Sequence, residues 1–154
     1  MELERAEKIA NEIIERLTPF CSRIQVAGSI RRKSPNPRDI DLVLIPSDLE
    51  ALRNELMKMG QVKMSGKKIS RVMIGNTQID IYVADEETWA TLLLIRTGSV
   101  ESNIRLCSIA KKRGWHLSAS GDGLFNEAGD RIAGDSEESI FNMLGLKYMK
   151  PEER

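Results

Sequence analysis

Residues 23–45 read RIQVAGSIRRKSPNPRDIDLVLI, with two apolar segments on either side of a stretch rich in turn-forming residues. We predict a first strand from Arg23 to Ala27, which runs into Gly28-Ser29. We predict a second strand from Asp39 to Ile45, which is nearly all apolar beyond its acids and is therefore expected to be buried. The polar residues of this stretch consequently lie at the ends of strands.

Two carboxylates, Asp39 and Asp41, stand at the start of the second predicted strand. Because strand side chains alternate with period two, both point to the same side while Ile40 enters the core. Paired carboxylates without an internal cation repel each other and raise each other's pKa, so this arrangement calls for a cation. Hard oxygen ligands favour Mg²⁺ or Mn²⁺. A pair of exposed acids at a strand end is the alternative, because Asp-x-Asp is common by chance.

A third acid, Asp80, lies in the apolar segment Gln78 to Val83, among residues that otherwise favour burial. If this strand pairs beside the Asp39 strand, the three carboxylates converge and can hold two divalent ions ~3.5–4 Å apart. This geometry stabilises both the attacking and the leaving oxygen in phosphoryl transfer.

The residues after the first strand can hold a triphosphate. Gly28, at a strand-to-turn junction, lets backbone N–H groups approach phosphate oxygens, and Ser29 adds a hydroxyl donor. Arg31 and Arg32 follow at once, and a guanidinium can clamp phosphate in a bidentate fashion. A Gly-Ser turn or a basic pair is an ordinary surface feature when taken singly, so the inference depends on the ordered set.

Helical and strand patterns fill the rest of the chain. Apolar spacing predicts a helix from Leu3 to Leu17, and Ser47-Asp48-Leu49-Glu50 has the form of a capping box for a helix that ends at Gly60. The further predicted elements are strands near 61–64, 69–74 and 78–83, helices over 86–95 and 99–113, a hairpin region over 115–133 and a last helix over about 136–144. This order predicts an α+β protein with two packed subdomains.

Composition limits the class of protein. The chain has 154 residues, of which 41% are hydrophobic and 30% charged, which is typical of a soluble globular protein. Its apolar runs fall short of the ~20 residues that cross a bilayer, and its charged first residues are unlike a secretory signal. We therefore expect an intracellular protein, cytoplasmic if prokaryotic. Cys21 and Cys107 have no partner at metal-ligand spacing and are expected to be reduced thiols.

Four motifs stand in order along the chain: Val26 to Lys33, Asp39 to Val43, Asp80, and Thr97-Gly98-Ser99 with Asn103. Together they resemble the family X DNA polymerases, the polymerase beta-like branch of the nucleotidyltransferase superfamily. The Gly-Ser and Asp-x-Asp pair fits any superfamily member, whereas the double arginine and the Thr-Gly-Ser with Asn are specific to this branch. The resemblance implies a palm over residues 1–85, with a nucleotidyltransferase-type mixed β-sheet and flanking helices. It implies a mainly helical thumb with a small antiparallel sheet over residues 86–154.

The resemblance also implies roles for individual residues. Asp39 and Asp41 would bind both metal ions, two Mg²⁺ or Mn²⁺ per site, and Asp80 would bind the catalytic metal and help to activate the primer 3′-hydroxyl. The phosphates would be held by Ser29 and Arg32, while Arg31 either assists them or faces a structural acid.

Further contacts with the substrates follow from the same resemblance. Gly28, Gly98, Ser99 and Asn103 complete the nucleotide site, with Asn103 on the minor-groove edge of the incoming base. A cis peptide bond is expected at Gly98-Ser99. The predicted nucleic-acid contacts are basic residues that can hold phosphates, namely Lys67, Lys68, Arg71 and Arg105.

We therefore expect a minimal DNA-directed DNA polymerase that adds dNMP to a primer 3′-OH in short gaps, in DNA repair. Its partners would be a nucleoside triphosphate and gapped or primer–template DNA, with no membrane. Family members usually begin with a lyase and a fingers domain, and nothing precedes the first helix here. We accordingly expect no lyase activity, and either a monomer or a chain whose partner protein supplies the missing DNA-binding domains.

Two other functions remain open. One is a template-independent nucleotidyltransferase that acts on RNA, protein or a small molecule, and the other is a non-catalytic nucleotide- or nucleic-acid-binding module. The doubled arginine and the Thr-Gly-Ser motif favour the polymerase over the first. The three intact aspartates argue against the second, because a degenerate homologue would be expected to lose an acid.

Low template fidelity is the first testable prediction. Cys107 stands where relatives often carry an arginine that reaches the template, and Tyr82 replaces a basic residue after the catalytic acid. Ile95 stands where they often carry an aromatic residue near the sugar, which leaves open the choice between ribo- and deoxyribonucleotides. We expect weak discrimination between correct and incorrect bases in single-nucleotide gap filling. A preference for the correct base above ~10⁴, which needs strong active-site discrimination, would contradict it.

Overall fold

The structure, a computed structural model, describes every residue from Met1 to Arg154 and divides into two compact units. The units are Met1–Ala84 and Asp85–Arg154, so the predicted boundary lies one residue later than the observed one. Each unit has its own apolar core. No helix combines the length and the apolar character that a membrane span requires. The α+β class predicted from the element order is confirmed.

The first unit is a five-stranded mixed sheet with helices. Its elements, in chain order, are α1 (Leu3–Leu17), η1 (Thr18–Phe20), β1 (Cys21–Val26), α2 (Gly28–Arg31), β2 (Ile40–Pro46), α3 (Leu49–Met59), β3 (Gln61–Ser65), β4 (Ile69–Ile74) and β5 (Thr77–Val83). The strand order is β1-β2-β5-β4-β3, in which β2 and β5 are parallel and the other neighbours antiparallel. β2 and β5 thus occupy the interior of the sheet.

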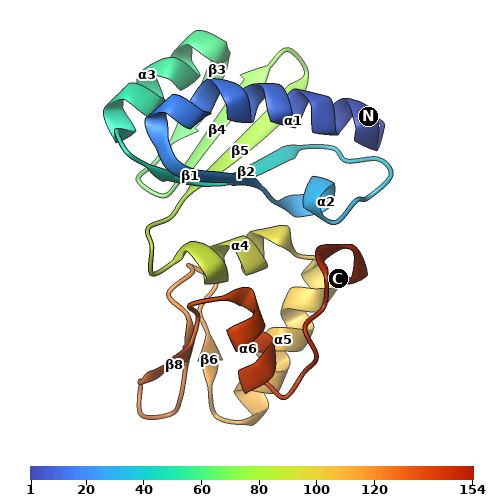
Figure 1. Ribbon diagram of the computed structural model, residues 1–154, viewed down its shortest axis with the longest axis vertical. Coiled ribbons are helices and arrows are strands. Elements are labelled where there is room, and N and C mark those ends of the chain that lie inside the picture. The colour runs from blue at the N-terminus through green and yellow to red at the C-terminus, as the bar shows by residue number, and fades with distance from the viewer. The chain divides into compact units, whose positions relative to one another are not determined.

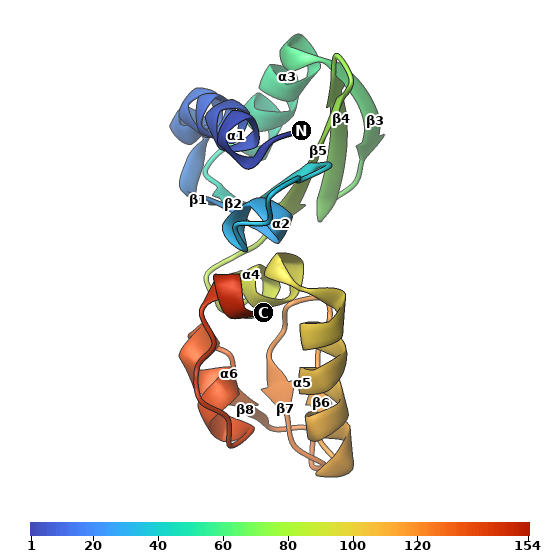
Figure 2. The ribbon, with the colours of Figure 1, turned by 90° about the vertical axis from the view of Figure 1, so that its right-hand side faces the viewer.

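Helices α1 and α3 cover one face of this sheet (Figure 1, Figure 2). Apolar residues of α1 recur every three or four positions, so a single stripe of the helix meets the strands. The buried residues that α1, β2 and β5 contribute to the core are Ala6, Ala10, Ile13, Leu17, Ile40, Leu42, Leu44, Ile79 and Ile81. Because side chains alternate along a strand, Asp41 and Asp80 project from the opposite face.

The start of α3 differs from the predicted capping box. Asp48, not Ser47, is the N-cap, and its side chain accepts a hydrogen bond from the Ala51 N–H at 3.0 Å. A carboxylate at the N-cap satisfies one of the N–H groups that have no partner within the helix. Ser47 lies one residue before the N-cap, and its backbone N–H donates to the Phe20 carbonyl at 2.9 Å.

The second unit combines three helices with a small sheet. Its elements are α4 (Trp89–Thr97), α5 (Val100–Lys112), β6 (His116–Leu117), β7 (Leu124–Phe125), β8 (Arg131–Ala133), α6 (Glu137–Met143) and η2 (Pro151–Glu153). The strands form an antiparallel sheet in the order β6-β7-β8, as predicted for the hairpin region. α4 begins later than residue 86 because the Asp85 carboxylate accepts from the N–H groups of Glu87 and Thr88, which holds a turn before the helix.

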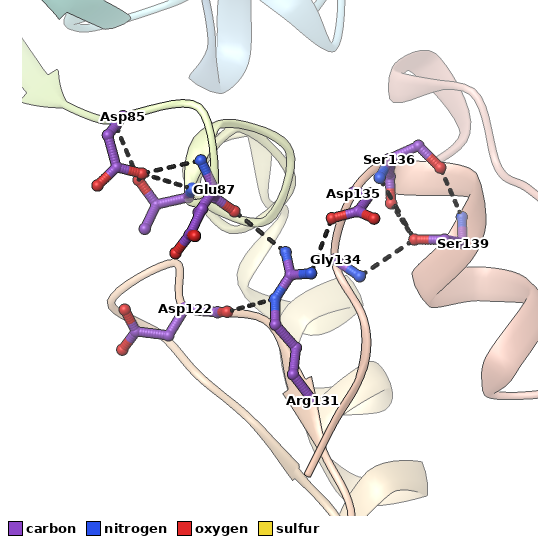
Figure 3. A network of polar contacts seen from close by, with 9 residues as sticks. Asp85, Glu87, Asp122, Arg131, Gly134, Asp135, Ser136 and Ser139 are labelled. Carbon is purple, nitrogen blue, oxygen red and sulfur yellow. Dashed lines mark hydrogen bonds and ion pairs between the residues drawn. The ribbon is translucent and has the colours of Figure 1, made fainter.

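Arg131 joins separate segments of the second unit (Figure 3). Its Nε donates to the Asp122 carbonyl at 3.0 Å, its Nη2 to the Glu87 carbonyl at 3.1 Å, and its Nη1 pairs with Asp135 at 2.7 Å. Gly123 and Gly134 leave room for this side chain: a Cβ would lie 2.8 Å from Nε at the first and 2.7 Å from Nη2 at the second. One guanidinium thus satisfies two loop carbonyls that would otherwise need water.

A buried ion pair anchors the end of the chain. Arg154 Nη1 lies 2.7 Å from Glu137 Oε2, and the two side chains are 0% and 9% exposed. Arg154 Nε also donates to the Met149 carbonyl at 2.9 Å, and the guanidinium lies over the Phe141 ring at 5.4 Å. The last residue is therefore part of the second core rather than a frayed end.

Both cysteines are free, as predicted. Burial raises the pKa of Cys21 to about 11 and also raises the pKa of Cys107. Each thiol therefore stays protonated at neutral pH, and a protonated thiol is a poor nucleophile and a poor metal ligand.

Arg154→Met is expected to destabilise the second unit strongly, because it leaves the Glu137 carboxylate buried without its counter-ion. The expected cost is about 3–5 kcal/mol, the usual penalty for breaking one side of a buried pair. Chemical denaturation followed by circular dichroism measures it. Lys147→Met, which removes the same charge from an exposed position nearby, is the control and should stay within about 0.5 kcal/mol of the parent. Equal effects of the two substitutions would contradict the structural role of Arg154.

Candidate active site

Gly28 brings the backbone after β1 against β2. The Ala27 N–H donates to the Asp41 carbonyl at 2.8 Å, and Gly28 then opens the single-turn helix α2 with a φ of +61°. A Cβ at Gly28 would collide with the Asp41 carboxylate. The predicted turn is thus a short helix. Glycine is required there both by its left-handed backbone and by the close approach of Asp41.

Parallel pairing of β2 with β5 puts two of the acids side by side. Asp41 and Asp80 are direct partners in the register, and Asp39 lies one residue before β2. The Asp80 strand therefore pairs beside the Asp39 strand as predicted. Asp80 is 5% exposed, whereas Asp39 and Asp41 are half-buried. The three carboxylates occupy one end and one face of the sheet.

Two neutral side chains of β5 contact these acids. Gln78 donates through Nε2 to Asp80 Oδ2 at 3.1 Å and to Asp39 Oδ2 at 3.5 Å. Tyr82 donates through its hydroxyl to Asp41 Oδ1 at 3.4 Å. Sequence reasoning did not assign Gln78 to the site. The available signal was its position two residues before Asp80, which places both side chains on the same face of the strand.

Arg71 forms an ion pair with Asp80. It lies on β4 directly opposite Asp80, with Nε 2.7 Å from Oδ1 and Nη2 3.3 Å from Oδ2. The hydrogen bond and negative charge of Asp80 raise the pKa of the Arg71 guanidinium, so it remains charged. Arg71 was predicted to contact nucleic acid, and the structure places it on a carboxylate of the site instead.

The donor set suits a hard divalent cation. Asp39, Asp41 and Asp80 offer only carboxylate oxygens, which Mg²⁺ and Mn²⁺ prefer. As the side chains stand, no group of three or more His, Cys, Asp or Glu residues converges closely enough to hold a metal ion. Asp80 already accepts hydrogen bonds from Arg71 and Gln78. The residues fit a cation chemically, and such a cation would compete with Arg71 for Asp80.

The predicted phosphate ligands Ser29 and Arg32 lie within one turn of Gly28. The Arg32 N–H donates to the Gly28 carbonyl at 3.1 Å, and the Ser34 N–H donates to the Ser29 carbonyl at 3.0 Å. Both side chains are half-buried, and Arg31 lies between them on α2. Lys33 pairs with Glu7 of α1 at 2.9 Å. This segment is therefore held by its own backbone and by α1.

The predicted nucleotide contacts Gly98, Ser99 and Asn103 belong to the second unit. The Gly98–Ser99 peptide bond is cis, as predicted. Ser99 is the N-cap of α5 and accepts from the Ser102 N–H at 3.3 Å. Asn103 donates through Nδ2 to the Ile95 carbonyl at 2.8 Å, whereas its buried Oδ1 has no hydrogen-bond partner. Asn103 thus retains one unused acceptor.

The remaining predicted nucleic-acid contacts are exposed. Lys67 and Lys68 form the turn between β3 and β4, the hairpin that also carries Arg71. Arg105 projects from α5 of the second unit, where its Nη1 lies 3.8 Å from the Met149 sulfur. The two lysines are free of carboxylate contacts and can meet a phosphate without breaking an internal pair.

Comparison with solved structures identifies the fold. The whole chain superimposes on Leishmania infantum polymerase beta in a ternary gap complex with a TM-score of 0.87 and 20% sequence identity, and the match covers 70% of that chain. For the ternary P/T complex of the same protein, the TM-score is 0.85, the identity 21% and the covered share 76%. The fold is therefore that of polymerase beta. Residues 92–154 match the family model of the DNA polymerase beta thumb.

Comparison with curated proteins points to the same family. The chain is 31% identical over 157 residues to the DNA polymerase/3′-5′ exonuclease PolX of Bacillus subtilis (strain 168), with 97% of this chain and 27% of that protein aligned. It is 27% identical over 172 residues to the Repair DNA polymerase X of African swine fever virus, with 99% and 98% aligned. The chain thus spans about a quarter of the bacterial relative's length and nearly all of the viral one. The predicted relationship to the family X DNA polymerases is confirmed.

Gly28→Ala is expected to impair the site beyond its effect on the backbone. A side chain at a φ of +61° costs about 1 kcal/mol, and here the new methyl group also displaces the Asp41 carboxylate. Gly75→Ala is the matched control, because Gly75 has a φ of +59° and open space around its Cβ position. Gly75→Ala should lose only the stability that the backbone conformation costs, whereas Gly28→Ala should lose more stability and should also bind Mn²⁺ more weakly, measured by electron paramagnetic resonance of free Mn²⁺. Equal Mn²⁺ affinity of the two variants would show that the contact with Asp41 is unimportant.

Proposed function

We propose that this protein is a DNA-directed DNA polymerase of the family X type, which adds dNMP to a primer 3′-OH in short gaps during DNA repair. The observation that carries the proposal is the pairing of Asp41 with Asp80 on adjacent strands, with Asp39 linked to Asp80 through the Gln78 amide. Three acids at one end of a sheet, beside a glycine that admits no side chain, make a site for a cation and a phosphate. The name of the viral relative, Repair DNA polymerase X, supports DNA as the acceptor and DNA repair as the pathway.

Asp39, Asp41 and Asp80 would hold two Mg²⁺ or Mn²⁺ ions. When bound there, the ions would polarise the phosphoryl oxygens and favour loss of the proton from the attacking hydroxyl. Asp80 lies deepest in the site and would lie next to the primer terminus, where its carboxylate helps to take up the proton of the 3′-hydroxyl. The 3′-oxygen forms its bond to the α-phosphorus while the bond to the bridging oxygen breaks, and pyrophosphate leaves.

Further residues of each unit would position the substrates. Ser29 would donate its hydroxyl to a phosphate oxygen, and Arg32 would neutralise the charge on the leaving pyrophosphate. Asn103, Gly98 and Ser99 of the second unit would contact the nucleotide, with Asn103 on the minor-groove edge of the incoming base. Lys67, Lys68 and Arg105 would bind backbone phosphates, a contribution that weakens as salt rises.

Replacing Asp80 by Ala should abolish transfer while nucleotide binding stays largely intact, because the phosphates are held mainly by Ser29 and Arg32. We expect a loss of about a thousandfold or more, the order seen when one preorganised catalytic group is removed. Primer extension with labelled dNTP and either metal measures transfer, and a fluorescent nucleotide measures binding. Unchanged turnover would remove the mechanism.

The same assay with different acceptors separates the candidate functions. Gapped DNA, single-stranded DNA and RNA are supplied in parallel with dNTPs or NTPs and with Mg²⁺ or Mn²⁺. Templated extension of gapped DNA supports the polymerase, whereas untemplated addition to single strands indicates a terminal transferase. Nucleotide binding without product under any condition would indicate a binding module.

A further inference from the structure

We infer that Arg71 has two alternative partners, Asp80 in the absence of a divalent cation and a nucleic-acid phosphate once a cation has taken Asp80. The inference rests on the proposed cation site. It reconciles the predicted role of Arg71 in binding nucleic acid with its observed place on a site carboxylate. Its consequence is that cation binding and nucleic-acid binding strengthen each other through a single side chain.

The first step is the geometry of the pair. Arg71 approaches Asp80 with two nitrogens, Nε at 2.7 Å from Oδ1 and Nη2 at 3.3 Å from Oδ2, so both carboxylate oxygens accept from it. Gln78 adds a third donor, at 3.1 Å from Oδ2. The pairing is fixed by the register, because Arg71 and Asp80 are directly opposed on antiparallel strands. Arg71 therefore uses both of the oxygens through which Asp80 would coordinate a cation.

The second step is competition. A guanidinium and a divalent cation carry like charge and compete for the same two carboxylate oxygens, so each weakens the binding of the other to Asp80. A cation that binds Asp39, Asp41 and Asp80 would therefore loosen Arg71 from Asp80, and the free energy lost from the ion pair lowers the apparent affinity for the cation.

The third step is the fate of the displaced side chain. The Arg71 side chain is 39% exposed, whereas that of Asp80 is 7% exposed, so the guanidinium can swing into solvent without opening the core. β4 leads directly out of the turn that carries Lys67 and Lys68. A released Arg71 would join the two lysines of this turn as a further cation, and a guanidinium can bind phosphate in a bidentate fashion.

These steps predict a reciprocal coupling. If a cation releases Arg71 for a phosphate, the cation tightens nucleic-acid binding, and nucleic acid must tighten cation binding by the same factor. The coupling needs no nucleotide and no chemistry, so it can be measured apart from catalysis.

The test is a thermodynamic cycle with Mn²⁺ and fluorescently labelled gapped DNA, without nucleotide and at constant ionic strength. Anisotropy gives the DNA affinity with and without Mn²⁺, and electron paramagnetic resonance of free Mn²⁺ gives the cation affinity without DNA. In the parent protein we expect Mn²⁺ to tighten DNA binding about tenfold, the scale of one charge-assisted contact. In Arg71→Met we expect about tenfold tighter Mn²⁺ binding without DNA, and loss of the tightening by Mn²⁺.

Two further variants make the result specific. Lys63→Met removes an exposed positive charge from the same hairpin and should keep both the parent cation affinity and the coupling. Arg71→Lys keeps the charge but not the two-point contact, so its cation affinity should lie between those of the parent and Arg71→Met. It replaces Arg71→Met as the test variant if the methionine variant does not fold. Parent-like cation affinity in both Arg71 variants, or parent-like coupling in Arg71→Met, would overturn the inference. Intact coupling without transfer of any nucleotide would overturn only the proposed function.

Discussion

The parallel pairing of β2 with β5 is the constraint on which the site depends. It places Asp41 opposite Asp80 by backbone hydrogen bonds alone, before any side-chain contact is considered. The pairing is stabilised from the other face, where Ile40, Leu42, Ile79 and Ile81 lie in the core beneath the helices. A shift of one residue would turn these apolar side chains outward and the acids inward. Burial of the apolar face therefore fixes the strand register that keeps Asp41 beside Asp80.

Placing acids next to each other costs free energy unless positive charge or hydrogen-bond donors offset their repulsion. Here each acid has a donor from a neighbouring side chain: Tyr82 for Asp41, and Gln78 for Asp39 and Asp80. Asp80, the most deeply buried of the three, also has a full opposite charge from Arg71. This accords with the larger desolvation penalty of a buried carboxylate, which a neutral donor offsets only in part.

Local chemistry made much of the fold and site predictable. Period-two alternation predicted that Asp39 and Asp41 point to one side, and the strand pairing on which the convergence of Asp80 depends is present. The close approach of Gly28 to the Asp41 carboxylate was not predicted, because the glycine was expected to admit a phosphate. The partner of Arg71 was not predictable in this way, because it follows from the register of β4 against β5. A sequence pattern shows which face a residue lies on but not which residue lies opposite. For the same reason, the anchoring of Arg154 on Glu137, 17 positions away in sequence, left no local signal.

Stability and chemistry are therefore divided between the two faces of the first sheet. The apolar face would hold β2 and β5 together whatever stood at positions 41 and 80, whereas the polar face gathers like charges that a fold without function would have no reason to collect. Removing one acid relieves repulsion but leaves its donor unpaired, and the balance differs by position. At Asp41 the donors include a tyrosine hydroxyl. At Asp80 they are a guanidinium and an amide, so neutralising Asp80 relieves repulsion among the acids but also removes an ion pair and a neutral hydrogen bond. The identity of the neighbouring donor, rather than burial alone, thus decides how far each acid of the site can change without a loss of stability.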